Sequence, residues 1–283
     1  MRNIILLTFT LLMTCGAFAE DSYNYSIEVG QFDKVRVLDN INVVYRYLPD
    51  STGYVQYRGE SNLENLFNFS AKGDGKLKIQ TQQEYENKVN LPVVYIYSDF
   101  LTSVENSSDS ELKVESLAPC AEFKATQIGN GRVVVDGLNA DKVIASLNTG
   151  NGTVNVAGKC EEAILKMVGT GMIAADRLRA EDVQCKILGT GTIGCWPVKN
   201  LSVKGIGSTK IYYKGTPVIK KSGGGKLIEL PADESEFNPG VDSDENLSSA
   251  GKKNPAIEKE DEKEKKPVEE DEEPQTVVTL EDD

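Results

Sequence analysis

Four copies of one short pattern decide the fold of this chain: IGNGRVVV at 128–135, TGNGTVNV at 149–156, VGTGMIAA at 168–175 and LGTGTIGC at 188–195. Two looser copies follow, KGIGSTKI at 204–211 and SGGGKLIE at 222–229. The first glycines stand at 129, 150, 169, 189, 205 and 223, so the steps between them are 21, 19, 20, 16 and 18 residues. A repeat of about 20 residues with two short strands and tight turns is typical of one rung of a β-solenoid.

Apolar residues recur at fixed distances from these corners. A period of two on both sides of the corner predicts strands with one buried face, and the repetition predicts rungs stacked about 4.8 Å apart. Ordinary hairpins in an antiparallel sandwich are the alternative, and they would not conserve these positions from copy to copy. The predicted inward residues are Val133, Val154, Ile173, Ile193, Val135, Val156, Ala175 and Cys195 after the corners, and Ala125, Ala145, Leu165, Cys185, Leu201, Gln127, Leu147, Met167, Ile187 and Val203 before them.

The Gly-polar-Gly corner itself has a physical explanation. Glycine adopts positive φ without a Cβ clash, which a sharp turn between two walls of a rung requires. The middle residues are Asn130, Asn151, Thr170 and Thr190. If the rungs stack in register, these side chains form a polar ladder along the corner.

The half of the chain before residue 118 also reads as β structure. Alternating or β-branched runs begin at residues 26, 34, 54, 76, 93 and 111, and GDG at 73–75 resembles another corner. We expect the same stack to continue here, with longer excursions near 50–53 and 84–90. No long amphipathic helix is predicted before the tail.

The N-terminus has the features of a secretory signal peptide over residues 1–19. A single Arg2 precedes an apolar run, and Ala17-Phe18-Ala19 forms an A-x-A cleavage site before Glu20. The apolar run is too short to span a bilayer. Cys15 raises the alternative of an outer-membrane lipoprotein that is lipidated at this cysteine. Thr14 argues against it, because the residue just before a lipidated cysteine is normally smaller than threonine. Export to the periplasm or cell surface is the prediction in either case.

Charge separates a body at 20–231 from a tail at 232–283. The whole chain has 31 basic and 44 acidic residues, a net charge of −13. The tail holds 6 basic and 19 acidic residues, whereas the body holds 24 basic and 25 acidic residues and is close to neutral. This composition predicts a disordered acidic tail, and it argues against nucleic-acid binding by the body. Self-association through the end rungs of a neutral solenoid remains open.

The absence of histidine restricts the chemistry of this protein. The sequence contains no histidine, which excludes Ser-His-Asp and Cys-His catalysis and His-ligated zinc. The glycine repeats lack the aspartate of calcium-binding nonapeptides and the helix start of a phosphate loop. We therefore predict no cofactor, no metal site and no catalytic residue.

One set of residues is nevertheless a weak candidate for a binding or carbohydrate-active site. Asp136, Asp176 and Trp196 each stand seven residues after a corner glycine. If they faced solvent, the two carboxylates would lie on the order of 10 Å apart beside an aromatic platform, a separation near that of inverting glycosidases. The simpler interpretation is that the aspartates open turns and Trp196 covers the end of a wall.

Four cysteines remain in the body: Cys120, Cys160, Cys185 and Cys195. Cys185 and Cys195 fall at inward positions, where a thiol behaves as a small apolar group. Cys120 and Cys160 are predicted to lie two rungs apart, beyond disulfide reach. A bond between Cys185 and Cys195 is left open, because exported cysteines often pair.

The order of motifs resembles one known family. An export signal, the alternating entry from Val35 to Tyr45, GDGKLKI at 73–79, the serial corners and IYYKGTPVI at 211–219 together resemble the putative auto-transporter adhesin, head GIN domain family, found largely in Bacteroidota. The resemblance covers about Ser26 to Leu230 and does not extend to the acidic tail. It implies an all-β, single-stranded right-handed parallel β-helix in an exported protein, with no established catalytic residues.

The sequence thus favours a non-enzymatic, adhesin-like binding or structural module at the bacterial cell envelope. Carbohydrate and another envelope or host surface protein are the partner classes left open. The alternative is a polysaccharide-active β-helix enzyme that uses carboxylates.

Overall fold

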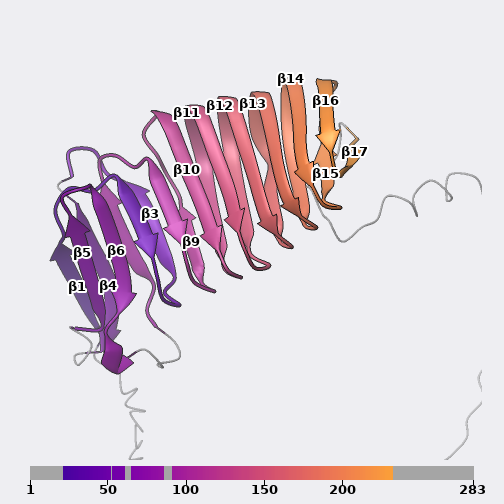
Figure 1. The fold of residues 1–283 in the computed structure, drawn as a ribbon. Coiled ribbons are helices and arrows are strands. Elements are labelled where there is room, and N and C mark those ends of the chain that lie inside the picture. The colour runs from indigo at the N-terminus through magenta and orange to yellow at the C-terminus, as the bar shows by residue number, and fades with distance from the viewer. Residues whose placement is uncertain (1–21, 52, 61–64, 86–90, 232–283) are drawn as a thin grey trace, which may run out of the picture. The chain divides into compact units, whose positions relative to one another are not determined.

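The computed structural model describes residues 22–51, 53–60, 65–85 and 91–231, which are almost entirely β structure (Figure 1). The only helical element among them is the 3-10 turn η1 (Gln83–Tyr85). No helix in this part of the chain is long and apolar enough to cross a bilayer. The strands are β1 (Ser22–Glu28), β2 (Lys34–Val37), β3 (Val43–Tyr47), β4 (Tyr54–Glu60), β5 (Phe67–Lys72), β6 (Lys76–Thr81), β7 (Val94–Ser98), β8 (Ser103–Asn106), β9 (Glu111–Val114), β10 (Cys120–Ile128), β11 (Arg132–Asn148), β12 (Thr153–Gly169), β13 (Met172–Gly189), β14 (Thr192–Ile206), β15 (Lys210–Tyr213), β16 (Val218–Gly223) and β17 (Lys226–Glu229).

The strands form two walls, which we name A and B. In spatial order, wall A contains β1, β4, β7, β3, β9, the first parts of β11 to β14, β15 and β17. Wall B contains β5, β6, β2, β8, β10, the second parts of β11 to β14, and β16. Each of the long strands bends from one wall to the other where its register shifts, as between Val135 and Leu138. The predicted β-solenoid is confirmed.

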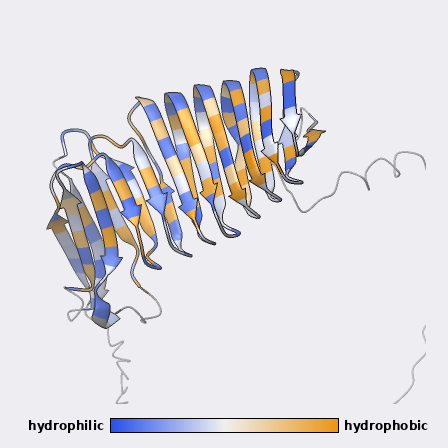
Figure 2. Ribbon diagram, in the orientation of Figure 1, coloured by the Kyte–Doolittle hydropathy of each residue, from blue (hydrophilic) through white to orange (hydrophobic). Residues whose placement is uncertain are grey.

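The predicted inward columns are all buried. Val133, Val154, Ile173 and Ile193 pair in register on successive rungs, and each is fully buried. Polar residues alternate with them along the strands, which Figure 2 shows as alternating orange and blue bands. Gln127 also points inward, and its Nε2 donates to the carbonyls of Ser108 and Ile128. The core therefore runs between the walls along the stack.

The corner glycines have two separate reasons to be glycine. Gly129 and Gly150 have φ of 93° and 73°, the conformation that the sequence predicted. The second glycines of the four closest copies, Gly131, Gly152, Gly171 and Gly191, do not adopt positive φ. A Cβ on Gly171 would lie 2.1 Å from the carbonyl oxygen of Gly152 on the rung below. Close approach of neighbouring rungs, as well as the turn itself, thus fixes this pattern.

The predicted polar ladder along the corner is confirmed for Asn130 and Asn151, and it begins on earlier rungs than the repeats indicated. The Oδ1 of Asn130 accepts the N–H of Asn151 at 3.1 Å, and the Oδ1 of Asp109 accepts that of Asn130 at 3.4 Å. Asn40 continues the ladder, because its Oδ1 accepts the N–H of Asp109 at 3.0 Å. The Thr170 hydroxyl instead donates to the carbonyl of Gly150. These side chains link the rungs across the corner.

The first half of the chain departs from the expected sequential stack. Strands β2 and β3 form a rung that lies between the rung of β6 and β7 and the rung of β8 and β9. The first rung in the sequence is therefore inserted into the stack. In addition, β1, β4 and β5 are antiparallel to their neighbours, and GDG at 73–75 is the turn of the β5–β6 hairpin, not a solenoid corner. The order of these strands in the stack is decided by hydrogen bonds between segments that are far apart in the sequence. Local sequence patterns do not predict such pairings.

The two ends of the solenoid are closed differently. At the N-terminal end, the antiparallel strands bring together Tyr25, Tyr57, Phe67 and Phe69, with ring centroids of Tyr25 and Tyr57 4.8 Å apart and those of Tyr57 and Phe67 5.1 Å apart. At the C-terminal end, β16 and β17 carry exposed residues, including Val218 and Ile219. Aromatic packing thus covers the first end, in the manner of a capping repeat. The predicted signal peptide and acidic tail lie outside the described residues.

Candidate functional site

The structure separates the three residues that the sequence nominated. The predicted column fails because the register of β13 and β14 shifts between Ala175 and Arg179, so that Trp196 lies opposite Arg179 instead of Asp176. Trp196 is 37% exposed, whereas Asp176 is only 4% exposed. Residues at the same distance from a corner glycine stay aligned along regular strands. They lose this alignment at the irregular bend between the two walls.

The two aspartates are also engaged with basic side chains. Asp176 Oδ2 lies 3.5 Å from the Nζ of Lys214, which is itself largely buried. Asp136 Oδ1 lies 3.7 Å from a guanidinium nitrogen of Arg177. The condition for a solvent-facing pair of carboxylates is therefore not met at Asp176. The simpler interpretation, that these residues organise the bend, agrees with this geometry.

A cluster of tyrosines with one arginine lies on the outer face of wall A, and we name it the Tyr–Arg cluster. It consists of Tyr54, Tyr95, Tyr97 and Arg46, carried by β4, β7 and β3. The rings of Tyr54 and Tyr97 stack at 4.6 Å, and the Arg46 guanidinium lies 4.7 Å from the centroid of Tyr95. The tyrosines are half-buried and Arg46 is exposed. Stacking fixes these side chains while leaving their polar ends accessible.

An ion pair holds the arginine of this cluster in place. Arg46 Nε donates to Glu115 Oε2 at 2.8 Å, and Lys113 donates to the other oxygen of the same carboxylate at 3.1 Å. The hydrogen bond from Arg46, followed by that from Lys113, lowers the pKa of Glu115. Two other tyrosines of wall A, Tyr45 and Tyr57, lie on its inner face and are buried in the core. The sequence could not tell which tyrosines face outward, and the register of β3, β4 and β7 decides it.

A groove of about 460 Å³ crosses the outer face of wall B near its N-terminal end, and we name it the wall B groove. Its volume falls in the range of small-ligand pockets. It combines the exposed ring of Phe100 with basic and acidic side chains from four neighbouring strands. Its lining residues are Lys34, Lys76, Phe100, Thr102, Ser103, Glu105, Cys120, Ala121, Glu122 and Lys124.

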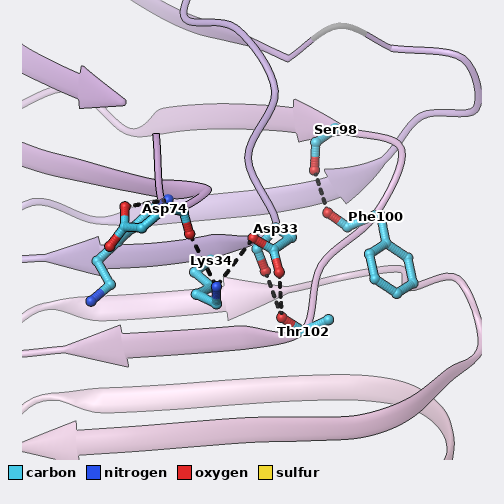
Figure 3. Close-up of polar contacts among 7 residues, drawn as sticks. Asp33, Lys34, Asp74, Ser98, Phe100 and Thr102 are labelled. Carbon is cyan, nitrogen blue, oxygen red and sulfur yellow. Dashed lines mark hydrogen bonds and ion pairs between the residues drawn. The ribbon is translucent and has the colours of Figure 1, made fainter. Parts of the chain in front are cut away.

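Contacts between rungs position one edge of the wall B groove (Figure 3). Lys34 Nζ donates to the carbonyl of Asp74 at 3.1 Å and lies 3.6 Å from Asp33 Oδ1. The Thr102 hydroxyl lies 3.0 Å from Asp33 Oδ2, and the Ser98 hydroxyl donates to the carbonyl of Phe100 at 2.9 Å. Sequence reasoning missed this groove, because its residues meet only through the inserted rung of β2 and β3.

A second hollow on wall B lies toward the C-terminal end and is lined mainly by acidic and amide side chains. Its volume is about 590 Å³, and Glu162, Asp182 and Asn200 are among its lining residues. These groups bond one another and nearby residues: Gln184 donates to Glu162 at 2.7 Å, and Asn200 donates to Asp182 at 2.6 Å. Among the described residues, no group of three or more His, Cys, Asp or Glu side chains is arranged to hold a metal ion.

The four cysteines are free thiols. Cys120 and Cys160 occupy one column with Ala140 between them, so the predicted separation of two rungs is confirmed. Cys185 and Cys195 are buried neighbours, and a hydrogen bond with Cys185, together with burial, raises the pKa of the Cys195 thiol. Burial also raises the pKa of Cys160, to about 12. The thiols of Cys160 and Cys195 are thus not arranged as reactive thiolates.

Residues 31–217 match the sequence model of one protein family, described as putative auto-transporter adhesin, head GIN domain. The chain belongs to this family. The match covers most of wall A and wall B, including the Tyr–Arg cluster and the wall B groove. No curated protein matches the chain.

Several solved structures share the fold. A putative adhesin from Bacteroides fragilis NCTC 9343 has a TM-score of 0.67 at 22% identity, and the alignment covers 75% of this chain and 98% of that one. A putative adhesin from Parabacteroides distasonis ATCC 8503 has a TM-score of 0.62 at 22% identity with the same coverage. A putative lipid binding protein from the same strain has a TM-score of 0.58 at 19% identity, again with 75% and 98% coverage. At these identities the likeness concerns the fold.

Proposed function

We propose that this protein is an exported, non-enzymatic binding module of the bacterial cell envelope that attaches to a surface carbohydrate or surface protein. The observation that carries the proposal is the Tyr–Arg cluster on wall A. Tyrosine and arginine, together with tryptophan, are enriched among the residues that dominate binding energy at protein surfaces, because they combine large contact area with polar groups. Membership of an adhesin family and the adhesin-named structural neighbours support the same role.

The rigidity of the cluster also favours binding. Arg46 is held by Glu115 and by the ring of Tyr95, and Tyr97 is stacked on Tyr54. A partner that contacts these groups meets side chains that are already ordered, so less conformational entropy is lost on association. The two-wall solenoid supports the cluster on paired strands.

The competing interpretation, a polysaccharide-active enzyme, has less support. It required Asp136 and Asp176 to face a common open surface, and Asp176 is buried beside Lys214. One of the two carboxylates would then lack access to a glycosidic bond or to the water that attacks it. We therefore place the function in binding without turnover.

The proposal is tested by adhesion of the mature protein to intact bacterial cells and to immobilised envelope polysaccharide. We expect saturable binding that weakens at least tenfold when Tyr97→Ser is combined with Arg46→Ala. The matched control is Lys186→Gln, which removes an exposed charge from wall B and should bind as the wild type does. Circular dichroism confirms that each variant retains its β structure.

Two results would contradict this function. One is the absence of saturable binding to any cell or polysaccharide preparation. The other is equal binding by the wild type and by the Tyr97→Ser, Arg46→Ala variant. This result would show that the Tyr–Arg cluster does not contact the ligand.

A further inference from the structure

We propose that the wall B groove is a saccharide site, with Phe100 as the platform for a sugar ring and the neighbouring lysines and glutamates as partners for its hydroxyl groups. This inference deepens the proposed function and rests on it, since it assigns a ligand class to a second surface of the same binding module. It does not depend on the Tyr–Arg cluster, which lies on the other wall.

The apolar part of the site is the ring of Phe100. This side chain is 41% exposed although it belongs to the short segment that joins β7 to β8, where a phenylalanine could turn inward to the core. Ser98 donates to the Phe100 carbonyl, and the next residue, Leu101, is buried, so the segment is fixed on both sides of the ring. The apolar face of a pyranose ring matches such an exposed aromatic surface.

The polar part of the site combines a row of hydrogen-bond donors, Lys76, Lys34, Ser103 and Lys124, with the carboxylates of Glu105 and Glu122. Lys34 and Lys76 lie on adjacent strands and are in register, and Ser103 follows Lys34 on the next strand. Glu122 and Lys124 form an ion pair at 2.8 Å on the far side. Vicinal sugar hydroxyls both donate and accept, so they can use the lysine and serine donors together with the carboxylate acceptors of Glu105 and Glu122.

Lys34 is already oriented for a ligand. Its ammonium has three N–H donors, of which the Asp74 carbonyl and the Asp33 carboxylate can take two. The third donor is left for an oxygen in the groove. Gly75 leaves room for the Asp33 carboxylate, because a Cβ at this position would lie 2.2 Å from Asp33 Oδ1.

Cys120 provides a reporter inside the groove. It lines the groove and is partly exposed, whereas Cys160, Cys185 and Cys195 are buried. Burial and the charge of Asp141 raise the pKa of the Cys120 thiol, so alkylation should be measured at a mildly alkaline pH. A saccharide seated in the groove would cover this thiol and slow its reaction.

The experiment combines alkylation of Cys120 with calorimetry, using the mature full-length chain. The probes are hexasaccharides of β-glucan, mannan and polygalacturonate, with glycerol as the control polyol. We expect at least one hexasaccharide to slow Cys120 alkylation severalfold and glycerol to have no effect. Phe100→Ala should weaken the binding of that hexasaccharide at least tenfold and Lys76→Gln severalfold, whereas Lys186→Gln, outside the groove, should leave the Kd unchanged.

The outcomes separate the groove from the function as a whole. If no hexasaccharide slows alkylation, or if Phe100→Ala and Lys76→Gln both bind as the wild type does, the saccharide site is overturned even where cell adhesion persists. A third result would also overturn the saccharide site: neutral hexasaccharides do not protect Cys120 from alkylation, whereas inorganic phosphate protects it as well as polygalacturonate does. The groove would then be an anion site. Loss of cell adhesion by the wild type would contradict the proposed function separately.

Discussion

Val203 and Lys221 occupy the same inward column of wall B on adjacent rungs. Every earlier member of that column is apolar, and the column ends in a lysine. Wall A ends in a similar way, because Glu229 pairs with Tyr213, which itself pairs with the buried Cys195 on the preceding rung. Charged residues that replace inward apolar ones are a device by which natural proteins block the edges of sheets. The preceding members of the wall B column are Leu77, Val35, Val104, Ala125, Ala145, Leu165 and Cys185.

The first prediction concerns this closed end. Replacing both charges, Lys221→Val with Glu229→Val, should produce concentration-dependent end-to-end association, because the last rung would then present an apolar edge with unpaired backbone groups. Sedimentation velocity at increasing concentration measures it. The matched control is Lys220→Val, which lies on the same strand but in an outward column, and it should remain as monomeric as the wild type. Equal association by the control would show that surface charge alone matters.

A second prediction tests the register of the repeats. Ile173→Asp should lower the free energy of unfolding by about 4 kcal/mol or more, because it buries an unpaired carboxylate in a fully buried column. Thr170→Ser at the adjacent corner keeps the exposed hydroxyl and should cost little. Denaturant unfolding followed by circular dichroism gives both values. The register would be wrong if Ile173→Asp were as stable as the wild type.

The inserted rung can be tested by cross-linking. Arg36 pairs in register with Glu105 on one side and with Lys78 on the other. The pair Arg36→Cys and Glu105→Cys should therefore form a disulfide on mild oxidation, whereas Lys78→Cys and Glu105→Cys, two rungs apart, should not. Peptide mass spectrometry identifies the linked pair among the native thiols. A sequential stack would give the reverse result.

A fourth prediction is a loss of stability at alkaline pH. Burial raises the pKa of Tyr45 to about 12 from its ordinary value of 10.0, and that of Cys160 to about 12 from 9.0. Both groups stay neutral in the folded protein while they ionise in the unfolded chain, so stability is retained below about pH 9 and falls progressively toward pH 12. Thermal melts across this range measure it. Cys160→Ala should make the loss of stability just above pH 9 less steep, because the ordinary pKa of cysteine, 9.0, is lower than that of tyrosine, 10.0.

Local patterns were sufficient to predict the regular half of the fold. Ile173 and Val154 are predicted correctly as inward-facing residues, because each rung repeats the same corner and the same alternation of apolar and polar residues. The distance from the corner glycine therefore fixes which residues pair on neighbouring rungs. The corner ladder from Asn130 to Asn151 followed from the same repetition. Asn40 and Asp109 were not anticipated, since no Gly-x-Gly pattern marks their rungs.

The surface sites could not be predicted from the sequence. Asp176 and Trp196 share a distance from the corner glycine, but the register shift in the bend separates them. Lys34 and Lys76 meet in the wall B groove only because β2 pairs in parallel with β6, a strand far along the sequence. Such contacts depend on which strands pair, and the first half of the chain has no constant repeat from which to infer the pairing.

Binding of a surface ligand without transforming it distinguishes the proposed adhesin-like role from that of a polysaccharide-active enzyme. The most direct test incubates the mature protein with purified envelope polysaccharide and measures, in one sample, the bound fraction and the number of reducing ends. We predict saturable binding with the polysaccharide recovered at its original length and no new reducing ends. Accumulation of reducing ends that depends on the protein, or no bound fraction at any concentration, would contradict the claim.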